Sequence, residues 1–470
     1  MVKRIVRIES ITIENFKNVT HGTVDFENKR KEYKASVLGL YGQNGSGKTA
    51  LIDAIQLLKF ALCGKAIPKK YADYINVGAE YATLKYEFLI RYAEVMYNAW
   101  YQFSIRKVID ENAISADEVT NDQTTTTTKV ELFDEVLSFS YETKTYKMRK
   151  TPLIDTRTDE LFVPKAKMQE LIGDDKEKYM DWLVTKRLTK ATSRSFVFSR
   201  ELINEYRKNC KNELYMKLIE GLYTYGYREL FIIDTESIGL ISLNTLPLVF
   251  KYKNETSEAV GGLLLSLNGP ALIQEDMYGV VENIIANMNI VLEQLVPGLR
   301  IGVVDLGSTM TKEGKIAKQI QLISLKNNKE IPFCYESEGI KKIVSILQLL
   351  IVVYNHPSVT VAIDELDGGV FEYLLGELLN IISEKGKGQL IFTSHNLRPL
   401  ETIDKGFVAF TTTNPKKRYI RLTNVKGTNN LRDFYYRDIV LGEQSEQVYN
   451  PTNNFEIALA FREAGEAFGS

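Results

Sequence analysis

The sequence predicts an α/β protein whose sheet is built from both ends of the chain, with a mainly helical lobe inserted between them. Near the N-terminus, residues 4–14, 22–27 and 35–41 have the patterns of short strands, and apolar residues recur at helical spacing over 48–62. Beyond residue 296, strand and helix patterns alternate, which is typical of a mixed or parallel sheet. Between these regions, helical periodicity dominates.

These patterns divide the chain of 470 residues into four expected segments. Residues 1–163 form the N-terminal part of the α/β domain, 164–295 the inserted lobe, 296–440 the C-terminal part of the same domain, and 441–470 a tail. The tail contains "NPTNNFEIALAFREAGEAF", which predicts a terminal helix. We favour an ordinary packed helix over a docking helix for this segment.

Composition excludes several classes of protein. No apolar run approaches the ~18–20 residues of a membrane helix. The N-terminus alternates apolar and charged residues, unlike a signal peptide, so we expect a cytoplasmic protein that does not contact a membrane. Its three cysteines have no paired spacing, which favours free thiols over disulfides or a zinc site: Cys63, Cys210 and Cys334.

The net charge of −1 does not indicate a nucleic-acid-binding protein. Local basic clusters nevertheless leave DNA binding open: Asn28–Lys34, Lys147–Lys150, Thr185–Lys190 and Lys416–Arg421.

The stretch "GQNGSGKT" lies between the apolar run 36–41 and the predicted helix, and it fits the phosphate-loop pattern G-x-x-x-x-G-K-[ST]. In such a loop, backbone N–H groups surround phosphate oxygens, Lys48 reaches the β- and γ-phosphates, and Thr49 ligates Mg²⁺. The pattern therefore predicts ATP and Mg²⁺ as cofactors. The nucleotide-binding candidates in this stretch are Gly42, Asn44, Gly45, Ser46, Gly47, Lys48 and Thr49.

Two later strand ends carry catalytic candidates. The apolar run "VTVAIDE" ends in Asp364, which we expect to hold Mg²⁺, and Glu365, which we expect to activate water as a general base. The run "LIFTSHN" places His395 at the next strand end, where it can orient water or the γ-phosphate. Together with Lys48, Glu365 and His395 are the predicted catalytic residues.

The segment "YESEGIKKIV" opens a helix that we expect to extend to about Tyr354. Its free N–H groups and dipole favour an anion in front of Ser337.

This order of phosphate loop, serine-glycine helix, acidic strand and histidine strand resembles the ABC-type ATPases, in the branch that holds the SMC, RecF and OLD-like proteins. The resemblance implies an ABC-ATPase head in which Ser337 and Gly339 complete the ATP site of a second copy, so that the protein works as a dimer or higher oligomer. Residues 1–110 and 295–425 carry it.

Further site residues follow from the same resemblance. "IENFKNV" is similar to the N-terminal nucleotide-side segment, which makes Lys17 and Asn18 candidates, and "FVFSREL" stands at the place of the Mg²⁺-reporting loop, with Ser199 and Arg200 in place of the usual glutamine. The acidic strand continues as "LDGG", where Asp367 is the candidate inter-subunit aspartate. Because "SEG" replaces Ser-Gly-Gly, we expect slow or partner-gated hydrolysis.

The middle of the chain lacks the long heptad repeats of a coiled coil, and no second set of catalytic residues is visible. We therefore expect a separate partner protein to carry out the reaction that ATP hydrolysis controls. The motif set resembles the AriA family of ATPases from PARIS anti-phage systems and, second, the ATPases of Septu systems. This resemblance implies an oligomeric sensor or scaffold that controls a separately encoded effector, a Toprim nuclease, and responds to a phage trigger protein. A RecF-like DNA-repair ATPase and a nucleotide-gated scaffold with little turnover are the alternatives.

Overall fold

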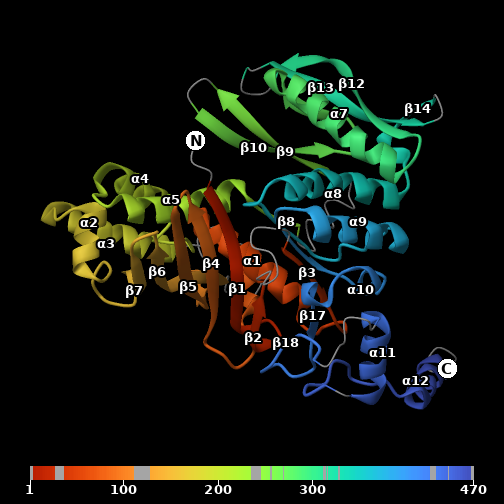
Figure 1. Cartoon of the computed structure of the whole chain (residues 1–470), viewed down its shortest axis with the longest axis horizontal. Helices are drawn as coiled ribbons and strands as arrows, with labels where there is room; N and C mark the ends of the chain where they lie inside the picture. The colour runs from red at the N-terminus through yellow and green to blue at the C-terminus, as the bar shows by residue number, and fades with distance from the viewer. Residues whose placement is uncertain are drawn as a thin grey trace, which may run out of the picture.

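The computed structural model describes residues 4–26, 36–110, 128–233, 245–254, 257–267, 269–310, 314, 316–326, 329–423, 430–442 and 444–466. The basic cluster Asn28–Lys34 lies outside these residues. The body contains two six-stranded sheets with helices on their faces, and a smaller unit of strands and one helix lies beside them (Figure 1).

The central sheet confirms the predicted fold class, because it combines strands from both ends of the chain. Its order is β18-β17-β3-β16-β15-β8. All neighbouring pairs are parallel except β17 with β18. The strands are β3 (Ser36–Tyr41), β8 (Leu230–Ile233), β15 (Thr360–Ile363), β16 (Gln389–Thr393), β17 (Val408–Thr411) and β18 (Tyr419–Ile420).

The second sheet is an antiparallel sheet of order β2-β1-β4-β5-β6-β7. It contains β1 (Arg4–Phe16), β2 (Val19–Asp25), β4 (Tyr81–Tyr92), β5 (Val95–Ile109), β6 (Thr128–Glu142) and β7 (Lys147–Asp155). Four helices lie against this sheet, with α2 and α3 next to β7 and β6 and α5 next to β1 and β4 (Figure 1): α2 (Lys165–Ile172), α3 (Lys176–Ala191), α4 (Arg200–Asn209) and α5 (Glu213–Arg228).

Helix α1 (Lys48–Leu62) agrees with the predicted helix and joins the two sheets. It has buried side chains on every turn and packs with α5, β1, β15 and β16. The alternation of side chains along β15 separates two cores: Ala362 faces the core that contains α1, whereas Val361 and Ile363 face the other core.

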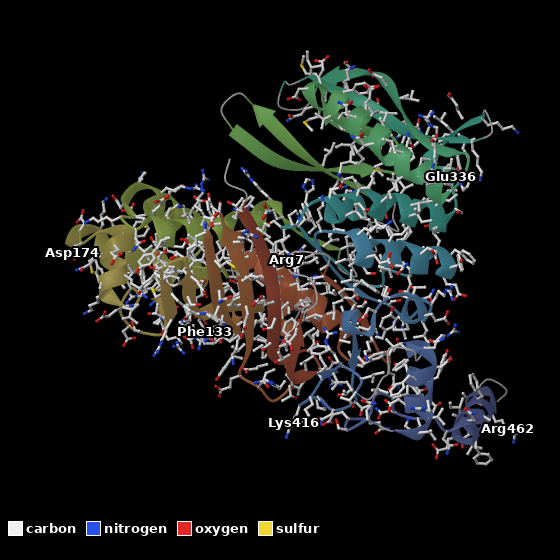
Figure 2. The ribbon with its side chains drawn as sticks, in the orientation of Figure 1. Arg7, Phe133, Asp174, Glu336, Lys416 and Arg462 are labelled. Carbon is white, nitrogen blue, oxygen red and sulfur yellow. The ribbon has the colours of Figure 1, made fainter. Side chains whose placement is uncertain are left out.

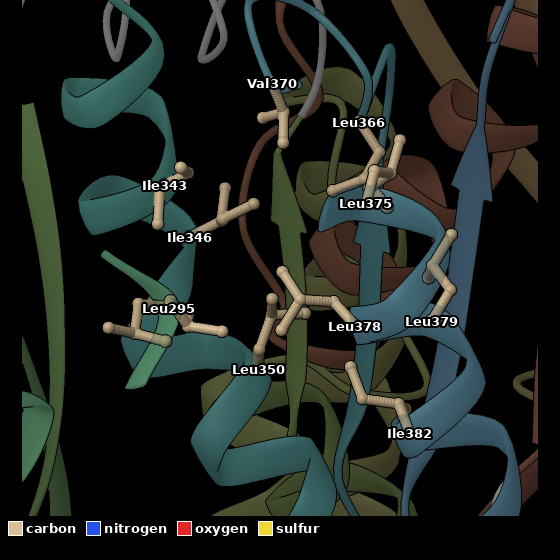
Figure 3. Close-up of a pocket in the computed structure, with 11 residues that line it drawn as sticks. Leu295, Ile343, Ile346, Leu350, Leu366, Val370, Leu375, Leu378, Leu379 and Ile382 are labelled. Atoms are coloured by element: carbon tan, nitrogen blue, oxygen red, sulfur yellow. The ribbon is translucent and has the colours of Figure 1, made fainter. Parts of the chain in front are cut away.

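Helices α8 (Glu338–Asn355) and α9 (Glu372–Lys385) cover this second face of the central sheet. Figure 3 shows apolar side chains of the two helices pointing toward one another, among them Ile346 and Leu350 from α8 and Leu378 from α9. The space between them is only about 10 Å³, too small for a ligand. The two helices therefore form a packed seam that holds the start of α8 in place.

The predicted lobe 164–295 does not pack as one unit. Helices α2–α5 pack on the antiparallel sheet and α1, and β8 joins the central sheet. The rest belongs with later residues, because β11 pairs with β13 and α7 packs on β12, so the predicted boundary at residue 295 lies inside this smaller unit. Its elements are β9 (Thr245–Asn254), β10 (Ser257–Ser266), β11 (Ala271–Gln274), α7 (Tyr278–Leu295), β12 (Leu299–Met310), β13 (Ile316–Lys326) and β14 (Lys329–Pro332).

The C-terminal region adds α10 (Pro399–Thr402), α11 (Leu431–Leu441) and α12 (Asn454–Glu466). The expectation of a packed terminal helix is wrong. Figure 2 places Arg462, on α12, at the margin of the molecule, and the described side chains of α12 are all exposed. Phe455 and Phe461 are 77% and 78% exposed, so α12 leaves apolar surface uncovered. Within the described residues, no helix is long and apolar enough to cross a membrane.

Candidate nucleotide-binding site

The phosphate loop connects the end of β3 to the start of α1, as the sequence predicts. Gly42 has φ +152°, and a Cβ there would lie 1.7 Å from Oγ1 of Thr411 at the end of β17. Gly47, at the start of α1, has φ +97°. Both positions therefore need glycine, because a side chain would be strained at either and would collide at Gly42. Asn44 and Gly45 form the exposed tip of the loop, whereas Ser46 is buried and bonds Thr411.

Lys48 is held across this loop. Its Nζ donates to the carbonyl oxygens of Gly42 at 2.8 Å and Gln43 at 3.1 Å. Burial lowers the pKa of Lys48, and the charges of Asp364, Glu365 and Asp367 oppose that shift. The phosphate loop and the three acidic residues therefore lie within electrostatic reach of each other.

The acidic pair follows β15, the strand two places from β3. Asp364 is buried and accepts a hydrogen bond from Oγ1 of Thr393, and the same Oγ1 accepts from the backbone N–H of Glu365 at 2.8 Å. Glu365 has φ +49°, in the left-handed region, and its side chain is exposed. Thr393, at the end of β16, thus fixes both acids: the Asp364 carboxylate points inward and the Glu365 side chain points to solvent.

His395 follows β16 by two residues and is exposed. Its backbone N–H and that of Asn396 donate to Oδ2 of Asp367, at 3.0 and 2.8 Å. Oδ1 of Asp367 is buried and has no hydrogen-bond partner among the described residues. Asp367 therefore joins the acidic loop to the histidine loop within one chain.

Ser337 caps α8, where its side chain accepts from the N–H of Ile340 at 3.4 Å, and both Ser337 and Glu338 are exposed. Gly339 lies against the loop after the acidic pair, because a Cβ on Gly339 would be 2.6 Å from the carbonyl oxygen of Gly369. Only glycine permits this approach. The start of α8 and the loop that carries Asp367 are therefore in direct backbone contact.

Behind this contact lies a residue that the sequence analysis did not single out. Lys342, on α8, is 7% exposed, and its Nζ has no hydrogen-bond partner within the described part of the chain. Burial lowers the pKa of Lys342, while Asp367, Glu365 and Asp364 favour its charged form. The acidic loop thus faces two buried amines, Lys48 from the phosphate loop and Lys342 from α8.

Tyr419, in β18, and Arg418, directly before this strand, contact the phosphate loop and its neighbours. The hydroxyl of Tyr419 donates to the carbonyl oxygen of Gly47 at 2.9 Å. The guanidinium of Arg418, 5% exposed, donates to the carbonyl oxygens of Asn18 and Thr412, and Asn18 Nδ2 donates to Gly45. Asn18 therefore contacts the phosphate loop through a hydrogen bond from its side-chain amide to the backbone carbonyl of Gly45. Sequence reasoning placed Arg418 only in a basic cluster, since nothing local shows that a residue 400 positions away packs on Asn18.

Two other candidates have different neighbours from those expected. Lys17 is paired with Asp53 of α1, and its Nζ lies 4.1 Å from the ring centre of Tyr74. Ser199 caps α4 and lies against Gly64, beyond the C-terminal end of α1. Because a helix of this length spans about 20 Å, Ser199 and Arg200 lie far from Lys48 and outside the nucleotide site.

The residues fit a nucleotide-bound Mg²⁺ better than a metal held by protein alone. Among the described residues, no three His, Cys, Asp or Glu side chains form a metal-binding group. Mg²⁺ that accompanies phosphates needs only one or two protein ligands, because phosphate oxygens and water supply the others. Thr49 at the start of α1 and the buried carboxylate of Asp364 would suffice.

Residues 10–224 match the sequence model of a family described as "AAA domain". The match begins in β1, includes the phosphate loop and ends in α5. A comparison with curated protein sequences gives no match.

Solved structures with similar folds include the SMC head domain from Pyrococcus furiosus, bound to the C-terminal domain of ScpA, with 11% identity, TM-score 0.38 and coverage of 89% of this chain and 96% of that one. The SMC head domain from Thermotoga maritima has 12% identity, TM-score 0.33 and coverage of 88% and 99%. The recombination mediator protein RecF with ATP has 12% identity, TM-score 0.36 and coverage of 89% and 100%.

Replacing Arg418 by methionine tests the support behind the phosphate loop. The substitution keeps the volume but removes the bonds to Asn18 and Thr412, so we expect nucleotide affinity to fall about tenfold, the effect of one hydrogen bond to a charged group. The measurement is titration calorimetry with ATP.

Arg421→Met is the matched control, because Arg421 also donates to backbone carbonyls, those of Gly406, Val408 and Asp25, but none belongs to the phosphate loop or its neighbours. Equal losses of affinity in both variants would contradict a specific role for Arg418.

Proposed function

We propose that the protein binds ATP with Mg²⁺ and hydrolyses it at sites shared between two copies of the chain. The observation that carries this proposal is the meeting of Lys48, Asp364 and Glu365 at one edge of the central sheet, where the two acids favour the charged form of Lys48 against the effect of its burial on the pKa. The carboxyl ends of parallel strands are where α/β proteins bind ligands. The AAA-domain match over residues 10–224 gives independent support.

In this proposal each residue has one role. The loop's N–H groups and Lys48 bind the β- and γ-phosphates, and Thr49 and Asp364 hold Mg²⁺, which neutralises charge on the phosphates. Glu365 takes the proton of the attacking water, because its side chain is exposed next to the buried Asp364. His395, exposed on the adjacent loop, orients that water or the γ-phosphate.

The position of Ser337 and Gly339 supports the shared site. They stand at the start of α8, where Ser337 is exposed, and Gly339 contacts the loop of Asp367 rather than the phosphate loop. An exposed helix start with free N–H groups suits the γ-phosphate of a nucleotide held by a second copy. We therefore propose a dimer, or a higher oligomer with the same interface.

Glu365→Gln tests the general base. The amide cannot accept the water's proton, so we expect kcat for ATP hydrolysis to fall roughly 10²–10⁴-fold while ATP binding is retained. Lys48→Ala should instead lose ATP binding. Phosphate release and ATP titration measure the two effects.

Glu377→Gln, an exposed glutamate of α9, controls for the loss of one surface charge. Unchanged hydrolysis in Glu365→Gln would contradict the assigned base. If function in cells then still required Lys48, a nucleotide-gated scaffold with little turnover would replace the ATPase proposal.

Mixing two inactive variants tests the shared site. Lys48→Ala and Ser337→Arg should each be inactive alone, but half of the randomly mixed dimers carry one intact site, so about a quarter of wild-type activity should return. The assay is ATP hydrolysis after mixing at equal concentration. If the mixture stays inactive although the two variants are shown to associate, the shared-site proposal fails.

We further propose that hydrolysis controls a separately encoded effector, a Toprim nuclease in an anti-phage system, with a phage protein as the trigger. Its supports are the motif resemblance and the exposed apolar side chains of α12, which offer a docking surface.

Most cations of the basic clusters that the structure describes have partners within the chain, which weighs against the DNA-repair alternative. Lys186 donates to three backbone carbonyl oxygens at 2.7–3.0 Å, and Lys190 pairs with Glu131. Lys147 pairs with Glu142, Lys150 lies over the Trp100 ring, and Arg418 and Arg421 bind backbone carbonyls. These cations have internal partners, whereas Arg149, Arg187 and Lys416 of the same clusters are exposed.

The α12 surface can be tested by co-expressing the chain with the product of its neighbouring gene. Phe455→Ser/Phe461→Ser should abolish co-purification, because it removes exposed apolar contact area, and should leave ATP hydrolysis unchanged. Glu456→Ser/Arg462→Ser, on the same helix, is the control. Co-purification that survives the phenylalanine substitutions would rule out α12 as the docking element.

A further inference from the structure

We infer that a mononucleotide binds a second site, a basic cavity at the C-terminal end of α1. The cavity has a volume of about 510 Å³ and lies between the Cys63–Ala66 loop, Arg194, α4 and α5. This volume is in the range of small-molecule sites. In Figure 1 α4 and α5 are labelled at the upper left, whereas α12 lies at the lower right.

The positive charge of the side chains that line the basic cavity favours an anionic ligand. Its lining includes four cationic side chains and no carboxylate: Lys65, Arg194, Arg200 and Arg207. Arg207 is neutralised by Glu220, whereas Arg194 and Arg200 have no ion pair or side-chain hydrogen bond within the described part of the chain. Burial raises the pKa of the Cys63 thiol to about 11, so it adds no negative charge.

Two tyrosines supply planar surfaces at the same place. The rings of Tyr223 and Tyr227 also line the cavity, with centres 5.3 Å apart and planes inclined at 40°. Lys65 lies 5.7 Å from the ring centre of Tyr227, and Arg207 lies 5.6 Å from that of Tyr223. Aromatic faces beside guanidinium and ammonium groups bind a planar base next to its phosphate. A nucleotide combines both features in one small ligand.

The walls of the basic cavity are fixed by close packing. A Cβ on Gly64 would lie 2.4 Å from the carbonyl oxygen of Phe198, so the Cys63–Ala66 loop rests directly on the segment before α4. Ser199 then caps α4 through the N–H of Leu202. This preformed shape limits the ordering that a ligand must impose on binding.

The basic cavity is separate from the phosphate loop. The loop lies at the N-terminal end of α1 and the cavity beyond its C-terminal end, about 20 Å away. Occupation of one site therefore does not require the other, and the inference stands whether or not ATP is hydrolysed.

AMP is the probe, because it lacks the β- and γ-phosphates that Lys48 would bind. Titration calorimetry on the full chain should show one AMP per chain, both in the wild type and in Lys48→Ala. Arg194→Ala/Arg200→Ala should weaken AMP binding at least about tenfold, the effect of removing charge-assisted contacts. It should leave the ATP hydrolysis rate unchanged.

Lys208→Ala is the matched control, because Lys208 is an exposed cation of the same helix α4 that does not line the cavity. Absence of AMP binding, or its loss in Lys48→Ala, would overturn the inference. So would inorganic phosphate that competes as well as AMP, since the rings would then contribute nothing. If a 5′-phosphorylated oligonucleotide bound tenfold more tightly than AMP, the mononucleotide proposal would be wrong, and the ligand would be the 5′ end of a nucleic-acid strand.

Discussion

The parallel pairing of β3 with β16 and β17 is the constraint on which the rest of the structure depends. It places Ser36 opposite Gln389, and Gly39 opposite Val408, although more than 350 residues separate these strands. Because the carboxyl ends of parallel strands meet at one edge, this pairing brings together the loops that follow β3, β15 and β16. The strand register is strongly specified, since a shift of one residue would exchange the faces of every side chain between the two cores.

The backbone contact between Gly339 and Gly369 adds a second constraint, which links α8 to the acidic loop. The carbonyl oxygen of Gly369 is too close to the Cα of Gly339 for a side chain on Gly339. The start of α8 therefore cannot shift without moving the loop that carries Asp367. The buried amine of Lys342 faces the same acids and reinforces this link electrostatically. A second copy that contacts Ser337 would therefore act on a rigid element already joined to the loop of Asp364, Glu365 and Asp367.

Much of this arrangement could be predicted, because local patterns encode it. The strand-loop-helix of residues 36–62, the helix cap at Ser337 and the strand-end position of Asp364 all depend on neighbours in sequence. What could not be predicted depends on packing between distant segments. No local pattern in the sequence indicates that Lys17 pairs with Asp53, or that Arg418 binds Asn18. The distance between Ser199 and the nucleotide site depends on the direction of α1, which the sequence does not give. Likewise, the exposure of α12 could not be predicted from the apolar spacing of its own residues, because it depends on whether other elements pack against them.

The hydroxyl of Thr393 shows how the fold sustains the strained backbone of Glu365, the proposed general base. Glu365 occupies the left-handed backbone region, which costs a non-glycine residue about 1–3 kcal/mol. The hydrogen bond from its N–H to Thr393, whose hydroxyl in turn donates to the buried Asp364, offsets this cost. The strained backbone separates the two adjacent carboxylates, directing one inward and the other to solvent. Adjacent acids in a regular strand would also point to opposite faces, but both would then enter the packed layers on either side of the sheet.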